Sequence, residues 1–269
     1  MKLSFAISLQ ETNFNYIVNN DRWQEKLKLL SDLGYHGVEL GIRNPEKLNI
    51  KALKSVLNRH KLELSAIGTG QAYIDEGLSL SSLKDKVRTE AIKRIKKQID
   101  LANLFKTQVI IGLIRGKIEG KKGSNDQYDK NLLNSTLKIC DYALSKNVIL
   151  AIEPLNRYET DFLNNVEETI SFIKKTECKN LKILLDTFHM NIEEKNLVNP
   201  IQKAFKYLSH IHLADNNRKC PGEGYIDFNQ IITNLKRLGY KGYLSGEMLP
   251  KPSAEYCIKK FIKVIKPYI

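Results

Sequence analysis

The chain has 269 residues, of which 42% are hydrophobic and 27% charged, an ordinary composition for one large globular domain or two small ones. Its formal net charge is +13, and the basic residues interleave with apolar ones at helical spacing, as in residues 84–88 and 93–97. We therefore attribute the charge to solvated helix faces and expect no nucleic acid partner. The longest apolar runs are far shorter than the ~20 residues of a membrane helix, so we also expect no membrane partner.

The cysteines and the N-terminal residues bear on the cellular compartment. The cysteines lie about forty residues apart without a C-x-x-C pair: Cys140, Cys178, Cys220 and Cys257. This spacing argues against a zinc ribbon, a redox motif or a disulfide scaffold. No small-residue cleavage site follows the apolar N-terminal run, which predicts a first strand rather than a secretion signal. We expect reduced thiols in a cytoplasmic protein.

Short strand-like runs alternate with longer amphipathic helical patterns along the whole chain. The predicted strands are Leu3–Ser8, Gly37–Leu40, Leu62–Thr69, Thr107–Leu113, Val148–Glu153, Leu181–Phe188, Leu208–Asp215 and Gly242–Leu249. The predicted helices are Arg22–Leu33, Pro45–His60, Leu83–Leu104, Asp129–Lys146, Asn165–Thr176, Pro200–Tyr207, Phe228–Leu238 and Ser253–Ile265. Most of the strands are apolar throughout, as in a parallel sheet that is covered on both faces.

Eight strand–helix units are the number that closes a barrel. We therefore predict an α/β fold, a (β/α)8 TIM barrel in which residues 1–269 form a single domain. A doubly wound open sheet is the alternative, but no G-x-G-x-x-G motif follows the first predicted strand. Two polar, glycine-bearing stretches after strands three and four, Gly70–Ser82 and Arg115–Gln127, predict long loops at the carboxyl face of the barrel, where active sites lie.

The residues that carry chemistry stand at the ends of the last four predicted strands. An ionised carboxylate at such a position is costly unless it is paired with a cation or bound to a metal, and an ion pair would explain any single one equally well. Because four consecutive strands repeat the pattern, we predict that one divalent metal ion is bound by Glu153, Asp186, His212 and Glu247. Three carboxylates and one imidazole favour Mn²⁺, with Co²⁺ or Mg²⁺ as alternatives, over a closed tetrahedral zinc site. His210 is expected to lie deeper on the same strand face and to pack there.

Three segments resemble the signatures of the ketose 3-epimerase family, which includes the D-tagatose and D-psicose 3-epimerases. They are residues 153–160 (EPLNRYET), 185–194 (LDTFHMNIEE) and 212–218 (HLADNNR). Residues 221–228 (PGEGYIDF) are similar to the loop after strand seven in the wider superfamily of xylose-isomerase-like barrels. The resemblance is close over predicted strands five to eight, and the strand–helix pattern extends it to the whole chain.

The resemblance implies a role for each matching residue. Glu153, Asp186, His212 and Glu247 match the metal ligands of the family. Glu153 and Glu247 also match its two catalytic carboxylates, which stand on opposite faces of the substrate. The residues that match those holding the C1–C3 end of the substrate are Glu159, His189 and Arg218. The family also implies a homo-oligomer.

The predicted chemistry is inversion of the carbon next to a ketone. One carboxylate removes the acidified proton from one face, and a second carboxylate returns a proton to the other face. The metal ion stabilises the enediolate as a Lewis acid. Two opposed glutamates favour epimerisation over aldose–ketose isomerisation, in which a proton moves along one face.

Strand four departs from the pattern of the sugar epimerases. Residues 111–117 (IGLIRGK) stand where D-psicose-type enzymes present an aromatic wall. Together with residues 70–73 (GQAY), they resemble the branch that contains 5-keto-L-gluconate epimerase, which interconverts that acid with D-tagaturonate. The predicted partner is therefore a keto-sugar or a keto-sugar acid, and Arg115 and Lys117 at the mouth of the site would bind a substrate carboxylate, Arg115 in bidentate fashion. The alternative is that Arg115 and Lys117 are surface charges of the loop.

Other functions on the same barrel remain as alternatives. The first is a hydroxypyruvate-type isomerase or an inosose dehydratase, against which the unbroken stretch Glu153–Thr160 argues. The second is an abasic-site endonuclease, which the basic charge favours. That nuclease needs a histidine-rich cluster of three zinc ions, and this chain has five histidines in all. A binding protein without catalysis would leave the metal ligands without a purpose.

Overall fold

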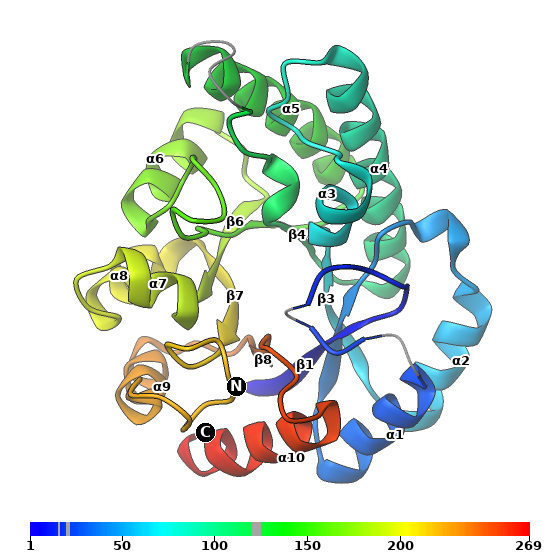
Figure 1. Cartoon of the computed structure of the whole chain (residues 1–269), viewed down its shortest axis with the longest axis vertical. Coiled ribbons are helices and arrows are strands. Elements are labelled where there is room, and N and C mark those ends of the chain that lie inside the picture. The colour runs from blue at the N-terminus through cyan, green and yellow to red at the C-terminus, as the bar shows by residue number, and fades with distance from the viewer. Residues whose placement is uncertain (16, 20–21, 120–124) are drawn as a thin grey trace.

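The computed structural model of the chain describes residues 1–15, 17–19, 22–119 and 125–269. Eight parallel strands form a closed barrel in which each strand pairs with its neighbours in sequence order, β1 to β8 (Figure 1). The strands are β1 Lys2–Ser8, β2 Gly37–Gly41, β3 Glu63–Gly68, β4 Val109–Ile111, β5 Leu150–Ile152, β6 Leu181–Asp186, β7 Leu208–Leu213 and β8 Tyr243–Gly246. The predicted α/β barrel is thus confirmed.

The helices that follow the strands surround the barrel (Figure 1). They are α1 Trp23–Leu33, α2 Ile50–His60, α4 Asp85–Phe105, α5 Asn125–Ser145, α6 Val166–Thr176, α8 Val198–Ala204, α9 Phe228–Leu238 and α10 Ala254–Ile265. Single turns of 3-10 helix occur at Pro45–Lys47, Leu113–Arg115 (η2), Phe205–Tyr207 and Lys266–Tyr268. Among the described residues, none of the helices combines the length and the apolar character needed to cross a membrane.

Two short helices lie where the sequence predicted a loop and the end of a strand. The predicted loop Gly70–Ser82 begins with α3, Gly70–Glu76, and the end of the predicted sixth strand is α7, Thr187–Glu193. Strand β6 stops at Asp186 because the carboxylate of this residue accepts the N–H of Phe188 and caps α7. Of the predicted loop 115–127, residues 120–124 lie outside the described part of the chain.

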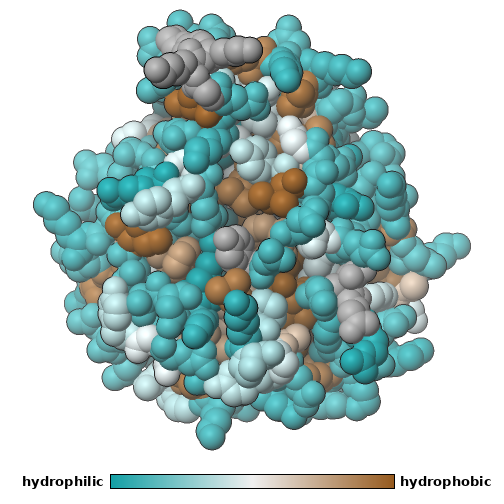
Figure 2. Space-filling view, in the orientation of Figure 1, coloured by the Kyte–Doolittle hydropathy of each residue, from teal (hydrophilic) through white to brown (hydrophobic). Residues whose placement is uncertain are grey.

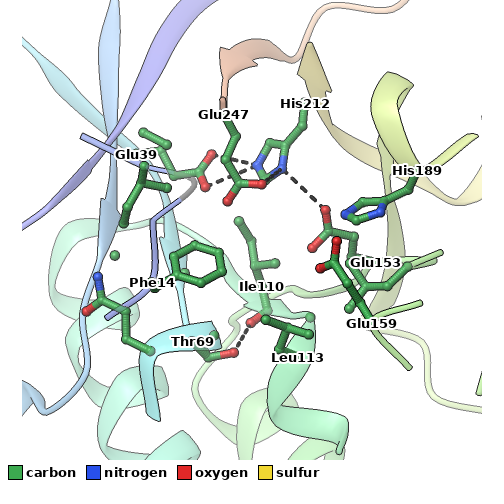
Figure 3. Close-up of a pocket in the computed structure, with 18 of the residues that line it drawn as sticks. Phe14, Glu39, Thr69, Ile110, Leu113, Glu153, Glu159, His189, His212 and Glu247 are labelled. Atoms are coloured by element: carbon green, nitrogen blue, oxygen red, sulfur yellow. Dashed lines mark hydrogen bonds and ion pairs between the residues drawn. The ribbon is translucent and has the colours of Figure 1, made fainter. Parts of the chain in front are cut away.

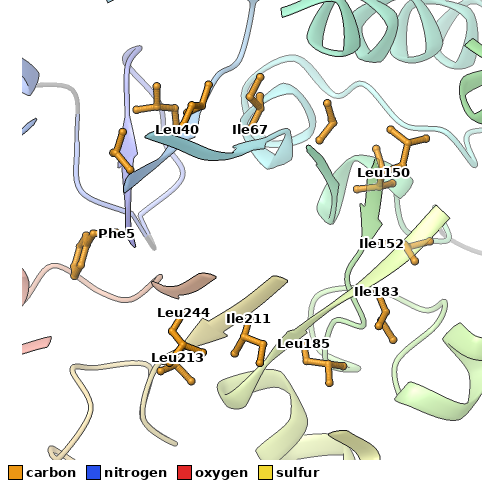
Figure 4. Close-up of a cluster of buried hydrophobic side chains, with 14 of the residues drawn as sticks. Phe5, Leu40, Ile67, Leu150, Ile152, Ile183, Leu185, Ile211, Leu213 and Leu244 are labelled. Atoms are coloured by element: carbon orange, nitrogen blue, oxygen red, sulfur yellow. The ribbon is translucent and has the colours of Figure 1, made fainter. Parts of the chain in front are cut away.

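The main core lies between the strands and the helices. Successive side chains of a strand point to opposite faces, so one set of each strand faces the helices and the other faces the barrel axis. The outward set is apolar and buried, as the labelled residues of Figure 4 show: Phe5, Leu40, Ile67, Leu150, Ile152, Ile183, Leu185, Ile211, Leu213 and Leu244. This set binds the helices to the barrel through apolar burial.

The inward set is different in character. Its apolar members form a small separate cluster of four residues, Ala66, Ile110, Ala151 and Leu184. Much of the remaining interior is polar and almost completely buried, as at Ser4, Glu39, His210 and Ser245. A stable barrel does not require buried acids and histidines, so the polar side chains that face the barrel axis point to a functional site.

The face shown in Figure 2 is mostly hydrophilic, with hydrophobic residues gathered near its middle.

Candidate metal centre and active site

Four neighbouring strands bring the predicted metal ligands to one point. Glu153 follows β5, Asp186 ends β6, His212 lies near the end of β7, and Glu247 follows β8. The register pairs Asp186 directly with His212, so the two side chains leave the barrel wall at the same level. Each of the four residues offers one ligand atom, and these atoms all lie within 4.8 Å of one another.

The atoms that face this point are buried and unsatisfied. His212 Nδ1 lies 3.4 Å from Glu153 Oε1 and 3.4 Å from Glu247 Oε2 (Figure 3). Within the described part of the chain, Glu153 Oε1, Asp186 Oδ2 and His212 Nδ1 have no hydrogen-bond partner. Such orphaned atoms are rare because each costs free energy, and a cation among them would satisfy all three. The residues therefore fit one metal ion, and their oxygen-rich set suits a hard cation.

The chain positions two of the ligands by simple local means. Asp186 uses Oδ1 to cap α7, 2.8 Å from the Phe188 nitrogen, and this leaves Oδ2 for the site. Glu153 depends on Gly112, because a Cβ at position 112 would lie 2.8 Å from Glu153 Oε2. A residue without a side chain at the end of β4 thus makes room for the carboxylate.

His212 is held from behind by Glu39, a residue that the sequence analysis missed. Its Nε2 lies 2.9 Å from Glu39 Oε2 and 3.1 Å from Glu39 Oε1. His210 Nε2 also lies 2.9 Å from Glu39 Oε2, so the prediction that His210 packs deeper in the barrel agrees with its contacts. The signal in the sequence was a single acid inside the apolar strand Gly37–Gly41.

Without a metal ion, the pKa values of Glu153, Asp186 and His212 are all raised. Burial raises the pKa of Asp186 well above its usual range, and the Glu153 and Glu247 charges add to this. Burial likewise raises the pKa of Glu153. Burial lowers the pKa of His212, but the charges of Glu39 and Glu247 outweigh this and raise it well above its usual value. A cation in the cluster would take the place of these protons.

Three of the residues predicted to hold the substrate, Glu159, His189 and Arg218, line a cavity beside this cluster. Arg218 Nη1 donates to Glu159 Oε1 at 2.5 Å, and Nη2 lies 3.9 Å from Glu247 Oε2. The guanidinium also lies over the Phe188 ring, 4.7 Å from its centroid. The structure therefore brings Glu159 and Arg218 together as a pair at the edge of the ligand cluster.

The ring of His189 lines the same cavity, and its hydrogen bonds show which of its two nitrogens carries the proton. The main-chain N–H of Asn156 donates to His189 Nδ1 at 3.2 Å, and Asn156 Nδ2 lies 2.7 Å from the same atom. Nδ1 is therefore the acceptor and Nε2 carries the proton. Burial and the Arg218 charge lower the pKa of His189 well below its usual value, so the ring is neutral. Asn156 was not singled out in the sequence, although it lies in the segment 153–160.

The loop after β7 is built around Asp215. Its buried carboxylate accepts main-chain N–H groups at 2.9–3.1 Å from Asn216, Gly222, Gly224 and Ile226. A Cβ at Gly224 would lie 1.9 Å from Asn216 Oδ1, so the loop closes only on a glycine. Residues 221–228, noted in the sequence, therefore serve to fix the loop that carries Arg218.

Arg115 is not where the sequence predicted it. Its side chain is completely buried and is not among the residues that line the cavity. Nη1 donates to the main-chain carbonyl of Glu153, and burial lowers the pKa of Arg115 to about 10. The prediction that Arg115 stands at the mouth is wrong, because the turn η2 directs the guanidinium beneath the Glu153 segment.

An apolar wall faces these charged groups. Phe14 and Ile17 come from the segment after β1, and Leu113 and Leu155 come from η2 and the segment after β5. Figure 3 shows Phe14 across the cavity from Glu153 and His189. Because aromatic walls were expected from strand four, Phe14 was missed; it reaches the site from the other side of the barrel.

Fold and site together define a (β/α)8 barrel with a cluster that could hold a metal ion at the carboxyl ends of its strands. Residues 27–266 match the family described as xylose isomerase-like TIM barrel. The chain belongs to this family, as the motifs predicted.

Named relatives refine the comparison. The chain is 41% identical over 124 residues to a D-psicose 3-epimerase of Enterocloster bolteae, a match that covers 45% of this chain and 39% of the relative. It is 25% identical over 238 residues to an L-ribulose 3-epimerase of Methylomonas sp., covering 84% of this chain and 80% of the relative. A crystal structure of D-allulose 3-epimerase from Methylomonas sp. in complex with D-allulose has a TM-score of 0.83 at 20% identity, covering 100% of this chain and 98% of that one. These proteins are named epimerases, the class of isomerase that the motifs predicted.

Proposed function

We propose that this protein is a metal-dependent epimerase that inverts the carbon next to the ketone of a neutral ketose. The observation that carries the proposal is the convergence of Glu153, Asp186, His212 and Glu247 on one point, where three of their buried atoms have no partner among the described residues. The epimerase relatives support the reaction class. Mn²⁺ is the proposed metal, because the oxygen-rich set with one imidazole suits it.

Glu153 and Glu247 are the proposed proton-transfer groups. They come from β5 and β8, which are separated around the barrel by β6 and β7, so the two carboxylates approach the cavity from different sides. One would remove the proton from the carbon next to the ketone, and the other would return a proton to the opposite face. The bound metal would supply Lewis acidity toward the ketone and hydroxyl oxygens.

The neighbouring side chains suit the charge that forms on the substrate. The neutral His189 ring lines the cavity, and its Nε2–H, which has no hydrogen-bond partner among the described residues, lies 3.6 Å from Asp186 Oδ2 at the ligand cluster. Arg218 adds N–H groups beside Glu247. Donors set in advance in a water-poor cavity stabilise a developing oxyanion most effectively. Glu159, which pairs with Arg218, would orient a substrate hydroxyl.

The lining of the cavity favours a neutral ketose over a keto-sugar acid. Arg218 is the single lysine or arginine among the described residues that line it, and Glu159 already pairs with it. The same lining contains four carboxylates, those of Glu39, Glu153, Glu159 and Glu247. Apart from the proposed metal ion, which Glu153 and Glu247 would bind, a substrate carboxylate would meet only Arg218 as a cation among the described residues, and Glu159 already pairs with it. Arg115, the residue predicted to bind the carboxylate of a keto-sugar acid, is buried and does not line the cavity.

A substrate panel tests the proposal. Chelator-treated protein is assayed with D-tagatose, D-fructose, D-psicose and L-ribulose, and with the acids D-tagaturonate and 5-keto-L-gluconate, before and after addition of Mn²⁺, Co²⁺ or Mg²⁺. We expect no turnover without metal and a preference for a neutral ketose with it. Full turnover in the metal-free protein would refute the metal-dependent reaction. Preference for an acid would restore the keto-sugar acid as the substrate.

A further inference from the structure

Glu39 lies inside the barrel and contacts two histidines of β7. The residue is 2% exposed, and the residues beside it on β2, Val38 and Leu40, are fully buried apolar residues of the outer core. Its carboxylate lies 2.9 Å from His210 Nε2. It also lies 2.9 Å from His212 Nε2, a contact drawn in Figure 3. A buried carboxylate is tolerated when such donors satisfy it.

These contacts define the orientation of the His212 ring. An ionised carboxylate only accepts hydrogen bonds, so the nitrogen that faces Glu39 must carry a proton. Nε2 is that nitrogen. Nδ1 is then the nitrogen that faces the cluster, 3.4 Å from both Glu153 and Glu247. Without an acceptor behind it, the ring could place its single proton on Nδ1 and donate it to one of these carboxylates, in competition with a metal.

Glu39 is itself held from the far side. Gln108 Nε2 donates to the Ser65 carbonyl at 3.3 Å, and this hydrogen bond fixes the orientation of the Gln108 amide group. The same nitrogen lies 3.3 Å from His210 Nδ1, so Nδ1 of His210 accepts and its Nε2–H donates to Glu39. A chain of contacts thus runs from Gln108 through His210 and Glu39 to His212.

We propose that Glu39 is a positioning residue that holds Nε2–H of His212, so that Nδ1 is turned to the metal centre. The inference rests on the metal site of the proposed function. The alternative is a second metal ion between Glu39, His210 and His212, whose ligand atoms also lie within 4.8 Å of one another. Positioning is favoured because the 2.9 Å contacts are complete hydrogen bonds without any ion.

The variant Glu39→Gln tests the proposal with little change of shape. A glutamine can keep its oxygen in the place of Oε2, 2.9 Å from both Nε2 atoms, but its N–H₂ then faces His212 Nε2 where Oε1 lies at 3.1 Å. The charge-assisted hydrogen bond to His212 thus becomes a neutral one with a donor beside it. We expect the Kd for Mn²⁺, measured by titration calorimetry, to rise about 10- to 100-fold, the usual loss when a carboxylate behind a ligating histidine is removed. Glu39→Asp keeps the carboxylate but withdraws it, and should give an intermediate Kd. It also provides the comparison if Glu39→Gln does not fold.

The matched control is Glu63→Gln, the same chemical change at an exposed residue of β3 that bonds Lys2 and Tyr243. Its Kd should equal that of the wild type. A second readout is the imidazole ¹⁵N spectrum of the Mg²⁺-loaded protein, in which the Nε2–H of His212 should be less protected from exchange in Glu39→Gln than in the wild type.

An unchanged Kd in both Glu39 variants, with His212 Nε2–H as well protected in Glu39→Gln as in the wild type, would overturn the proposal. Two equivalents of Mn²⁺ in the wild type and one in Glu39→Gln would also overturn it and indicate the second metal site. Turnover is not a readout here. A wild type that binds one Mn²⁺ but epimerises no ketose would refute the proposed function and leave the comparison of Kd values valid.

Discussion

Asn156→Asp should invert the hydrogen bond that orients His189. The amide nitrogen of Asn156 lies 2.7 Å from His189 Nδ1 and donates to Glu159 Oε1 at 3.0 Å. An aspartate would offer an oxygen at both contacts. A charge-assisted hydrogen bond is worth ~1.5–3 kcal/mol against ~0.5–1.5 for a neutral one. The new carboxylate should therefore draw the ring proton to Nδ1 despite the main-chain N–H at 3.2 Å.

The expected result is a loss of turnover. With the proton on Nδ1, Nε2 of His189 can no longer donate to the oxyanion, and removal of one such donor lowers kcat by ~10²–10³-fold. Asn156→Ala removes the side-chain donor but keeps the main-chain one, so the tautomer should survive. The loss then corresponds to one neutral hydrogen bond, about 2- to 10-fold. Asn180→Asp is the control, since Asn180 bonds main-chain carbonyls of Cys140 and Val148 away from the cavity.

Steady-state kinetics on the best ketose of the panel, with kcat and KM determined separately, measures these losses. The ¹⁵N spectrum of His189 in the Mg²⁺-loaded protein reports the tautomer directly. Equal losses in Asn156→Ala and Asn156→Asp would refute the reasoning, because they would show that the protonated nitrogen of His189 does not matter. Wild-type kcat in Asn156→Asp would refute it as well.

Three further predictions concern the metal centre and its surroundings. Glu153→Gln and Glu247→Gln should each lower kcat by at least ~10²-fold, and a variant of either with wild-type kcat would remove that residue from proton transfer. The raised pKa values of Glu153, Asp186 and His212 mean that the metal-free site holds protons that a cation must displace. Mn²⁺ affinity should therefore increase as the pH is raised, with measurable proton release, and a pH-independent affinity would contradict this. Arg115→Ala should lower the free energy of unfolding by about 2–3 kcal/mol and reduce turnover of neutral and acidic ketoses alike. A loss confined to acids would return Arg115 to the substrate.

The barrel and the convergence of Glu153, Asp186, His212 and Glu247 at one point could be predicted because their signals are local. Each apolar strand carries its polar residue at the carboxyl end, and parallel strands collect those ends at one face. Asp186 and Glu247 are found in this way without knowledge of any contact. Helix α7 was missed because the pattern around Asp186 is also compatible with the interior of a longer strand. Only the structure shows that the Asp186 carboxylate caps the helix that follows.

The contacts behind the ligands could not be predicted. Glu39 and His210 are 171 positions apart, and nothing in the Gly37–Gly41 segment tells that its acid faces the barrel axis rather than the helices. The direction of Arg115 depends on one 3-10 turn after β4. Such orientations follow from register and turn geometry, which a hydrophobic pattern does not specify.

The central step of the proposed reaction is the replacement of the hydrogen atom on the carbon next to the ketone. The Mn²⁺-loaded protein is incubated in D₂O with the ketose it turns over, and NMR follows the carbon next to the ketone. Because Glu153 and Glu247 would exchange protons with solvent between removal and return, the inverted product should carry one deuterium at that carbon. Inverted product that retains the original hydrogen would contradict the two-carboxylate account.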